Sequence, residues 1–276
     1  MSDTPIRAHL ICGGFPPGSS AGHDMDFARR GLLELLGENP LIAATTANDF
    51  ADIDKWLPGT QLLISYVAGP YPDADQCEAI EAWLEGGGRY LALHGSSGGK
   101  AATIDGDRRR RQMVKLDHHR LLGGFFLNHP PLQKFRVDVS RSDSPLLRGL
   151  PESFEVADEL YLIELQERDA TQVLLTCELP KDPSPQGFGF EYGADTALEA
   201  DGKTRVLGYT RNVGNGAVTY IALGHCHAPS CNVQPFVHTS VDPEGRTPQT
   251  FRGSWESDAF LQLLRNGIDW GAEARA

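Results

Sequence analysis

The chain has 276 residues, of which 40% are hydrophobic and 22% charged, a globular balance that excludes wholesale disorder. Its formal net charge of −12 at pH 7 excludes general nucleic-acid binding, which requires a basic face. The five cysteines are odd in number and mostly far apart, the N-terminus lacks a signal-peptide core, and no apolar run reaches the ~18 residues of a membrane helix. We therefore expect a reduced, cytoplasmic protein.

The first half of the chain combines apolar runs with helical stripes, and most of them are followed by glycine. The predicted strands are 8–12, 41–46, 61–67 and 89–93. The predicted helices carry two apolar faces, one formed by Ala28, Leu32, Leu35 and Leu36 and the other by Cys77, Ile80, Trp83 and Leu84. Because these strands are apolar throughout rather than alternating, they are expected to be covered on both faces, as in a parallel sheet.

The second half is richer in strands, predicted at 135–139, 172–177, 204–210 and 217–223, and it ends in a helix with Phe260, Leu263 and Leu264 on one face. Segments 179–201 and 228–254 show no regular pattern and are expected to be functional covers or inserts. No linker divides the chain. The predicted fold is one α/β domain over 1–276, an open, mostly parallel sheet flanked by helices on both faces.

His94 ends the apolar run 89–93 and is followed by Gly95-Ser96-Ser97-Gly98-Gly99. This pattern indicates a buried strand and a sharp turn. In an open α/β sheet, ligands bind at the carboxyl ends of the strands, and related folds place a Ser or Cys nucleophile at such a corner. His94 is therefore predicted to line the functional cleft.

Three further histidines and a carboxylate occupy comparable places. His23 follows the first strand, His225 follows the last, and His129 and Glu159 lie in loops. Such a cluster can hold a divalent metal such as zinc, or it can move protons, because histidine titrates near neutral pH. The chain has no HExxH motif, and the Cys/His spacing in 225–231 matches no zinc module, so the sequence leaves both chemistries open.

Other features have competing interpretations. Ser96 or Ser97 beside a histidine could act as a nucleophile, although the G-x-S-x-G pattern is absent. The basic run 108–111 is expected to be a solvated loop or a pairing face for carboxylates. Tyr71 and Trp255 are candidate stacking surfaces for a sugar ring, or core residues.

Taken in order, these motifs resemble the ThuA-like (trehalose utilisation) family. The matching segments are His23-Asp24, 87–95 (GGRYLALHG), 122–130 (LGGFFLNHP), 149–151 with 158–161 (DELY), 216–225 (GAVTYIALGH) and 260–270. The resemblance covers nearly the whole chain. The chain departs from the family's simplest members at 16–20 and 228–254.

The resemblance implies a class I glutamine amidotransferase-like, or flavodoxin-like, fold. None of the five cysteines falls at the His94 corner, so glutaminase chemistry is excluded.

The resemblance further implies an enzyme of carbohydrate catabolism, acting on a sugar or keto-sugar as a lyase, isomerase or hydrolase. His94, His225 and Glu159 are the predicted catalytic residues. The predicted metal ligands are His94, His129 and His225, and the predicted substrate-binding residues are His23, Asp24, Gly95, Ser96 and Tyr161. The expected partner is a carbohydrate-like small molecule, with no nucleic acid or membrane; self-association as a homo-oligomer is left open. The alternatives are a non-catalytic carbohydrate-binding protein and a Ser-dependent hydrolase.

Overall fold

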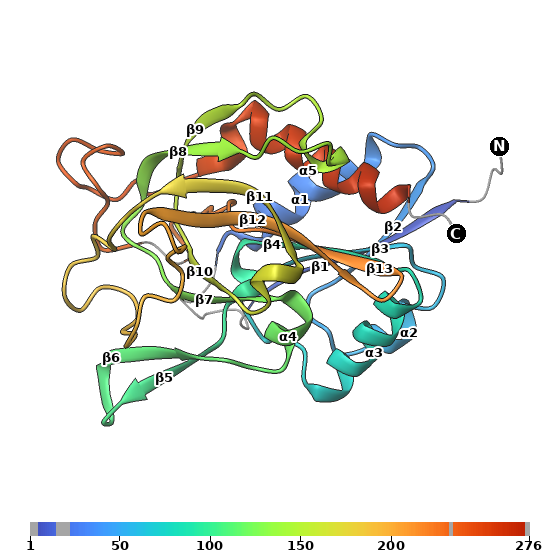
Figure 1. Ribbon diagram of the computed structural model, residues 1–276, viewed down its shortest axis with the longest axis horizontal. Helices are drawn as coiled ribbons and strands as arrows, with labels where there is room; N and C mark the ends of the chain where they lie inside the picture. The colour runs from blue at the N-terminus through green and yellow to red at the C-terminus, as the bar shows by residue number, and fades with distance from the viewer. Residues whose placement is uncertain (1–4, 15–22, 232–233, 274–276) are drawn as a thin grey trace.

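The computed structural model describes residues 5–14, 23–231 and 234–273, so the loop segment 16–20 lies outside the described residues. A nine-stranded sheet with the order β2-β1-β3-β4-β13-β12-β11-β8-β9 forms its centre (Figure 1). These strands are β1 (Ile6–Gly13), β2 (Ile42–Ala47), β3 (Leu62–Val67), β4 (Arg89–Leu93), β8 (Gln133–Val139), β9 (Ser153–Asp158), β11 (Thr171–Glu178), β12 (Thr204–Val213) and β13 (Gly216–Ile221).

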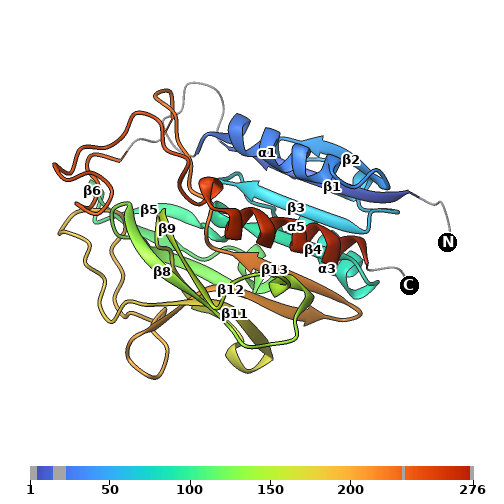
Figure 2. The same cartoon turned by 90° about the horizontal axis from the view of Figure 1, so that it is seen from above.

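One half of this sheet is the predicted α/β layer. Strands β2, β1, β3, β4 and β13 run parallel to one another. The helices are α1 (Met25–Gly37), α2 (Ile53–Trp56), α3 (Ala74–Glu85), α4 (His118–Leu122) and α5 (Asp258–Ala272). Helices α1 and α5 pack together on one face, and α3 packs with α2 and α4 on the other (Figures 1 and 2). The two-sided cover explains why β3 is buried along its whole length.

The other half of the sheet corrects the prediction of a mostly parallel sheet. Strand β12 runs antiparallel to β13, and β11, β8 and β9 each run antiparallel to the strand before them in the sheet order, so the sheet as a whole is mixed. A short turn at 214–215 joins β12 to β13, and such a turn can connect only antiparallel strands. The outer strand β2 also differs from expectation, because most of its residues are exposed at the sheet edge.

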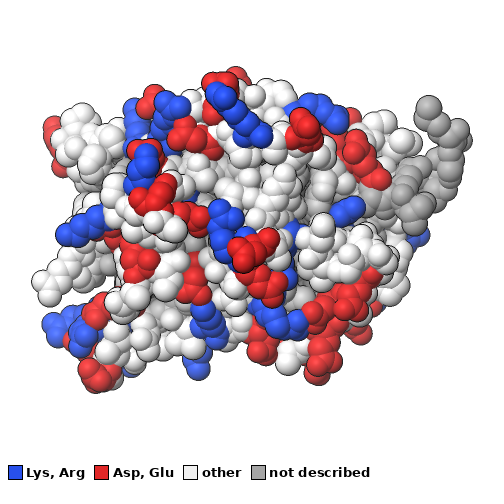
Figure 3. Space-filling view, viewed as in Figure 1, with Lys and Arg blue, Asp and Glu red and all other residues white. Residues whose placement is uncertain are grey.

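Two small sheets were not predicted from the sequence. One pairs β7 (Gly124–Asn128) with β10 (Leu162–Leu165), and the other is a hairpin of β5 (Lys100–Ile104) and β6 (Asp107–Val114). The basic run 108–111 therefore belongs to a strand rather than to a loop. It does act as a pairing face, since Arg109 contacts Asp107 and Arg110 contacts Glu191. Basic and acidic side chains lie side by side on this hairpin, at the lower left of Figure 3.

Local signals fix where the two longer N-terminal helices begin. The Asp24 carboxylate accepts a hydrogen bond from the Phe27 amide at 3.1 Å and caps α1. Asp73 and Gln76 form a reciprocal capping box at the start of α3. Within the described ranges, no helix is long and apolar enough to cross a membrane.

The strand order places the site. Strand β1 lies between β2 and β3 in the sheet. The chain runs from β1 to β2 on one side and then crosses to β3 on the other side, so the strand order reverses at β1. In open α/β sheets, the crevice beyond the carboxyl ends of the strands at such a switch point is the usual ligand site. The loop carrying His23 follows β1, and the neighbouring strands β4 and β13 lead to His94 and His225.

Candidate functional site

His94 occupies a strained corner at the end of β4. Its φ of 45° lies in the left-handed region, which non-glycine residues rarely adopt. The parallel register pairs Leu93 with Ile221, so His94 lies beside Ala222 of the neighbouring strand end. Its Nδ1 is 2.7 Å from the Ala222 carbonyl oxygen. Backbone strain of this kind costs of order 1–3 kcal/mol and clusters at functional sites.

Four predicted site residues converge at this corner. The ligand atoms of His23, His94, Glu159 and His225 all lie within 4.8 Å of one another. Glu159 Oε2 is 3.4 Å from His94 Nε2 and 3.1 Å from His225 Nδ1, and His225 Nδ1 is 3.0 Å from His23 Nδ1. We call these four side chains the histidine–glutamate cluster. His94, Glu159 and His225 are fully buried, whereas His23 reaches the pocket above them.

Hydrogen bonds on the far side of each ring set the tautomers. A carbonyl oxygen can only accept, so His94 Nδ1 carries the hydrogen that binds Ala222. In the same way, His227 Nε2 donates to the Pro248 carbonyl at 2.8 Å. His227 Nδ1 then accepts from His225 Nε2 at 3.0 Å. Neutral His94 and His225 therefore both direct an unprotonated nitrogen at Glu159.

This arrangement requires positive charge between the rings and the carboxylate. His94 Nε2 is buried and makes no hydrogen bond within the described residues. The neutral ring presents a lone pair at this nitrogen, and a carboxylate oxygen also presents a lone pair, so the two atoms cannot form a hydrogen bond without an added proton. Burial alone would raise the pKa of Glu159, but the surrounding His129 and His225 hold that pKa well below its usual value. Burial and the neighbouring imidazoles lower the pKa of His23, which keeps its ring neutral. A proton or a metal ion between the imidazole nitrogens and the Glu159 carboxylate would supply this charge.

Asp158 holds the cluster in place without belonging to it. Its carboxylate accepts hydrogen bonds from the backbone amides of Gly224 and His225 at 2.8 and 3.0 Å, and from the Ser254 hydroxyl. These bonds tie the end of β9 to the loop after β13, so that Glu159 meets His225. Antiparallel β9 thereby supplies a carboxylate to an edge otherwise built by parallel strands.

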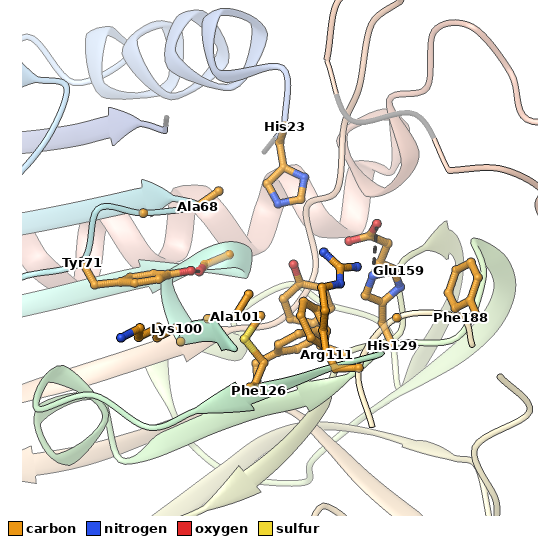
Figure 4. Close-up of a pocket in the computed structure, with 18 of the residues that line it drawn as sticks. His23, Ala68, Tyr71, Lys100, Ala101, Arg111, Phe126, His129, Glu159 and Phe188 are labelled. Carbon is orange, nitrogen blue, oxygen red and sulfur yellow. Dashed lines mark hydrogen bonds and ion pairs between the residues drawn. The ribbon is translucent and has the colours of Figure 1, made fainter. Parts of the chain in front are cut away.

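A pocket of about 910 Å³ opens above the cluster (Figure 4). This volume is within the range of small-molecule sites, roughly 300–1,000 Å³. The floor includes His23, His129 and Glu159, and the walls carry five aromatic rings. These rings are Tyr71, Phe126, Tyr161, Phe188 and Phe190. The unassigned segments supply part of this pocket, because 187–190 forms a wall and Gln234 also lines it.

His129 and Tyr161 approach the cluster from the pocket side. His129 Nε2 is 3.7 Å from Glu159 Oε1, farther than His94 and His225 lie from this carboxylate, and His129 is not within the histidine–glutamate cluster. The Tyr161 ring stacks on His94 with centroids 4.2 Å apart. Of the three predicted metal ligands, the structure brings His94 and His225 together with His23 in the cluster, whereas His129 lies outside it.

Other predicted residues point elsewhere. Asp24 caps α1 and binds Arg252 at 2.7 Å. The Ser96 hydroxyl contacts Ser65 at 2.8 Å beneath the corner, and the buried Ser97 hydroxyl contacts Tyr220 at 2.7 Å. Trp255 is buried and its indole donates to the Gly224 carbonyl, which makes it a core residue, whereas Tyr71 lines the pocket.

Sequence reasoning missed three residues that shape the site. His227 orients His225, and Gln234 donates through its side-chain amide to Glu159 Oε1. Asn128 holds the pocket wall, because its carbonyl oxygen accepts the Phe190 amide at 2.9 Å. Asn128 and His227 adjoin predicted site histidines in sequence, which is a signal that could have found them. Gln234 has no such neighbour.

Gly95 allows the corner to approach its surroundings, and its replacement by alanine is expected to disturb the site. A Cβ at Gly95 would lie 2.5 Å from the Val67 carbonyl oxygen and 3.3 Å from His23 Nε2. We expect Gly95→Ala to lower the free energy of unfolding by about 1–3 kcal/mol, measured by urea denaturation. Gly37→Ala is the matched control, since nothing lies within 4 Å of its Cβ. Equal stability of the two variants would contradict the packing argument.

The fold and site define a class, an α/β protein with a buried histidine–carboxylate cluster at the carboxyl edge of its parallel strands. The chain belongs to the ThuA family, whose model, described as trehalose utilisation, matches residues 20–239. The resemblance seen in the sequence motifs is thereby confirmed. No curated protein matches the chain.

Solved structures support the fold. A putative ThuA-like protein from Bacteroides uniformis aligns with a TM-score of 0.60 at 16% identity, covering 99% of this chain and 93% of that one. A putative ThuA-like protein from Parabacteroides merdae aligns with a TM-score of 0.58 at 16% identity, covering 99% and 92%. A β-galactosidase from Rahnella sp. R3 shares the fold over 80% of this chain but only 29% of its own, at 17% identity and a TM-score of 0.51.

Proposed function

We propose that this ThuA-family protein is a metal-dependent enzyme of cytoplasmic carbohydrate catabolism that acts on a sugar or keto-sugar. The observation that carries the proposal is the pair of buried imidazole nitrogens, His94 Nε2 and His225 Nδ1, directed at one oxygen of Glu159. His23 Nδ1 lies 3.0 Å from His225 Nδ1 and adds a third nitrogen to the same cluster. The family description, trehalose utilisation, supports the substrate class.

A metal ion satisfies this cluster better than protons do. One proton can bridge Glu159 to only one of the three rings. Two protons would place two imidazolium ions in contact at a buried site, where the desolvation cost is several kcal/mol per ion. One divalent cation satisfies all three nitrogens and the carboxylate at once. Three of the distances between ligand atoms in the cluster, 3.0–3.4 Å, also suit neighbours around zinc, where bonds of about 2.0–2.1 Å separate tetrahedral ligands by about 3.3 Å.

The pocket places proton-transfer groups beside that centre. A bound metal would polarise a substrate carbonyl or lower the pKa of a bound water. His129 Nδ1 donates to the Pro130 carbonyl at 2.8 Å, which leaves its Nε2 free to take a proton on the pocket side. Tyr161 and Phe126 offer apolar ring faces next to it. The arrangement does not favour a serine nucleophile, because the Ser96 and Ser97 hydroxyls are buried beneath the corner.

Metal analysis of the purified protein tests this function together with turnover of sugars and keto-sugars. We expect about one equivalent of zinc or a similar ion per chain. His94→Asn, which tolerates the left-handed backbone, should lose both the metal and turnover. His238→Asn, at an exposed histidine remote from the cluster, should keep both. Full turnover by His94→Asn would overturn the proposal. Stoichiometric metal with tight sugar binding and no turnover would instead establish a binding protein.

A further inference from the structure

The β5–β6 hairpin places two cationic residues in the lining of the pocket, Lys100 of β5 and Arg111 of β6. The Arg111 side chain extends toward His23 and Glu159, whereas the Lys100 side chain points away from them (Figure 4). The neighbours of Arg111 in the basic run form ion pairs with other residues. Arg109 pairs with Asp107, and Arg110 pairs with Glu191. Within the residues that the structure describes, no carboxylate lies within ion-pair distance of Arg111, although the chain carries a net charge of −12.

An aromatic face holds this guanidinium instead of a carboxylate. Arg111 Cζ lies 4.8 Å from the centroid of the Phe190 ring. A cation–π contact of this kind contributes about 0.5–2 kcal/mol and leaves the N–H donors free. An incoming anion therefore need not break an ion pair to reach Arg111. Glu159 does not serve as that anion, because His94 and His225 contact its Oε2 and Gln234 binds its Oε1.

The surroundings fix the position of the Arg111–Phe190 pair. The Arg111 carbonyl accepts the Glu191 amide at 2.7 Å, and Asn128 accepts the Phe190 amide at 2.9 Å. Gly189 has a φ of +72°, and a Cβ there would lie 2.1 Å from the Asn128 side-chain oxygen. The wall can take this path only with glycine at that position. The backbone that carries the guanidinium and the ring is thus held in place before a ligand arrives, which reduces the ordering cost of binding.

We infer that Arg111 forms an anion subsite, so that the substrate is a sugar bearing an oxyanion, a carboxylate or a phosphate ester, opposite the group that meets the histidine–glutamate cluster. This inference rests on the proposed function. The guanidinium fork binds either oxyanion through two parallel hydrogen bonds. A neutral sugar of the same shape would leave the guanidinium without an anionic partner.

Calorimetric titration of the metal-loaded protein with three probes, glucose, glucuronate and glucose 6-phosphate, tests the subsite. We expect at least one of the two anionic probes to bind roughly 10- to 100-fold more tightly than glucose, the value of a charged hydrogen bond. The tighter of the two anions identifies the oxyanion. Arg111→Met should remove this preference while leaving the metal content unchanged. Arg109→Met, in the same run but paired with Asp107, should retain the preference.

The outcomes separate the subsite from the proposed function. Equal affinity of wild-type protein for glucose and both anions would overturn the subsite, even with the metal and turnover intact. A preference that survives Arg111→Met would overturn it as well. Absence of metal from the wild-type protein would instead overturn the proposed function, whatever the probes show.

Discussion

Glu159→Gln is expected to remove the metal while making the metal-free protein more stable. The substitution keeps the shape of the side chain but replaces one oxygen by an NH₂ group with two donors. In the metal-free protein, that group can donate to His94 Nε2 and His225 Nδ1, now 3.4 and 3.1 Å from Glu159 Oε2. We expect the free energy of unfolding to rise by about 1–2 kcal/mol. Metal affinity should fall at least about 100-fold, because Glu159 would bind the metal directly. The loss of a residue that only hydrogen-bonds to a metal ligand already lowers affinity by about 10–100-fold.

These opposite signs distinguish a metal centre from a histidinium–glutamate ion pair. In a buried ion pair, neutralising Glu159 would leave an uncompensated imidazolium and lower stability by about 3–5 kcal/mol. Urea denaturation in the presence of chelator and metal titration monitored by calorimetry measure the two effects. Glu244→Gln, at an exposed carboxylate, is the control and should change neither. Loss of stability in metal-free Glu159→Gln would favour the proton over the metal.

Removing the metal from the wild-type protein is expected to lower its melting temperature by about 10 °C. A ligand present at about 1,000 times its dissociation constant stabilises the native state by about 4.1 kcal/mol. For a chain of this size, each kcal/mol shifts the melting temperature by roughly 2–4 °C. Scanning calorimetry before and after chelation measures the change, and added metal should reverse it.

Variant proteins sharpen that experiment. Chelation should leave the melting temperature of Glu159→Gln and His94→Asn unchanged, because neither retains the complete cluster. His238→Asn should respond as the wild type does. A wild-type melting temperature that is insensitive to chelator and to added zinc would argue against a metal in the histidine–glutamate cluster.

The sequence was sufficient for the parallel half of the fold and for the residues at its edge. Uninterrupted apolar runs mark β1, β3 and β4 as largely buried strands, and glycine shortly after each of these three runs marks where the strand ends. His94 could be placed at a corner on this basis, and the ordered motifs around His23, Glu159 and His225 led to the ThuA family. The antiparallel half was harder to assign. The neighbour of each strand and its direction relative to that neighbour depend on pairing between distant segments rather than on the local sequence pattern.

Local pattern also failed for the pocket walls. Segments 179–201 and 228–254 have no periodicity, yet they supply Phe190 and Gln234 to the pocket. Asn128 fixes the first of these segments from another strand, a contact across 62 residues. The charged strand β6 was expected as a loop, because a strand in a solvated hairpin lacks the apolar face that normally reveals one.

The sequence by itself determined which side chains could carry chemistry, and it excluded a thiol nucleophile at the His94 corner. Only the tertiary structure decided how those side chains combine. Tautomers depend on what each far nitrogen contacts, so the roles of Ala222 and Pro248 as acceptors become visible only when the chain is folded. The structure also decides that His23 rather than His129 joins the cluster. Which histidine lies within a few ångströms of the other ligand atoms depends on packing between distant segments of the chain.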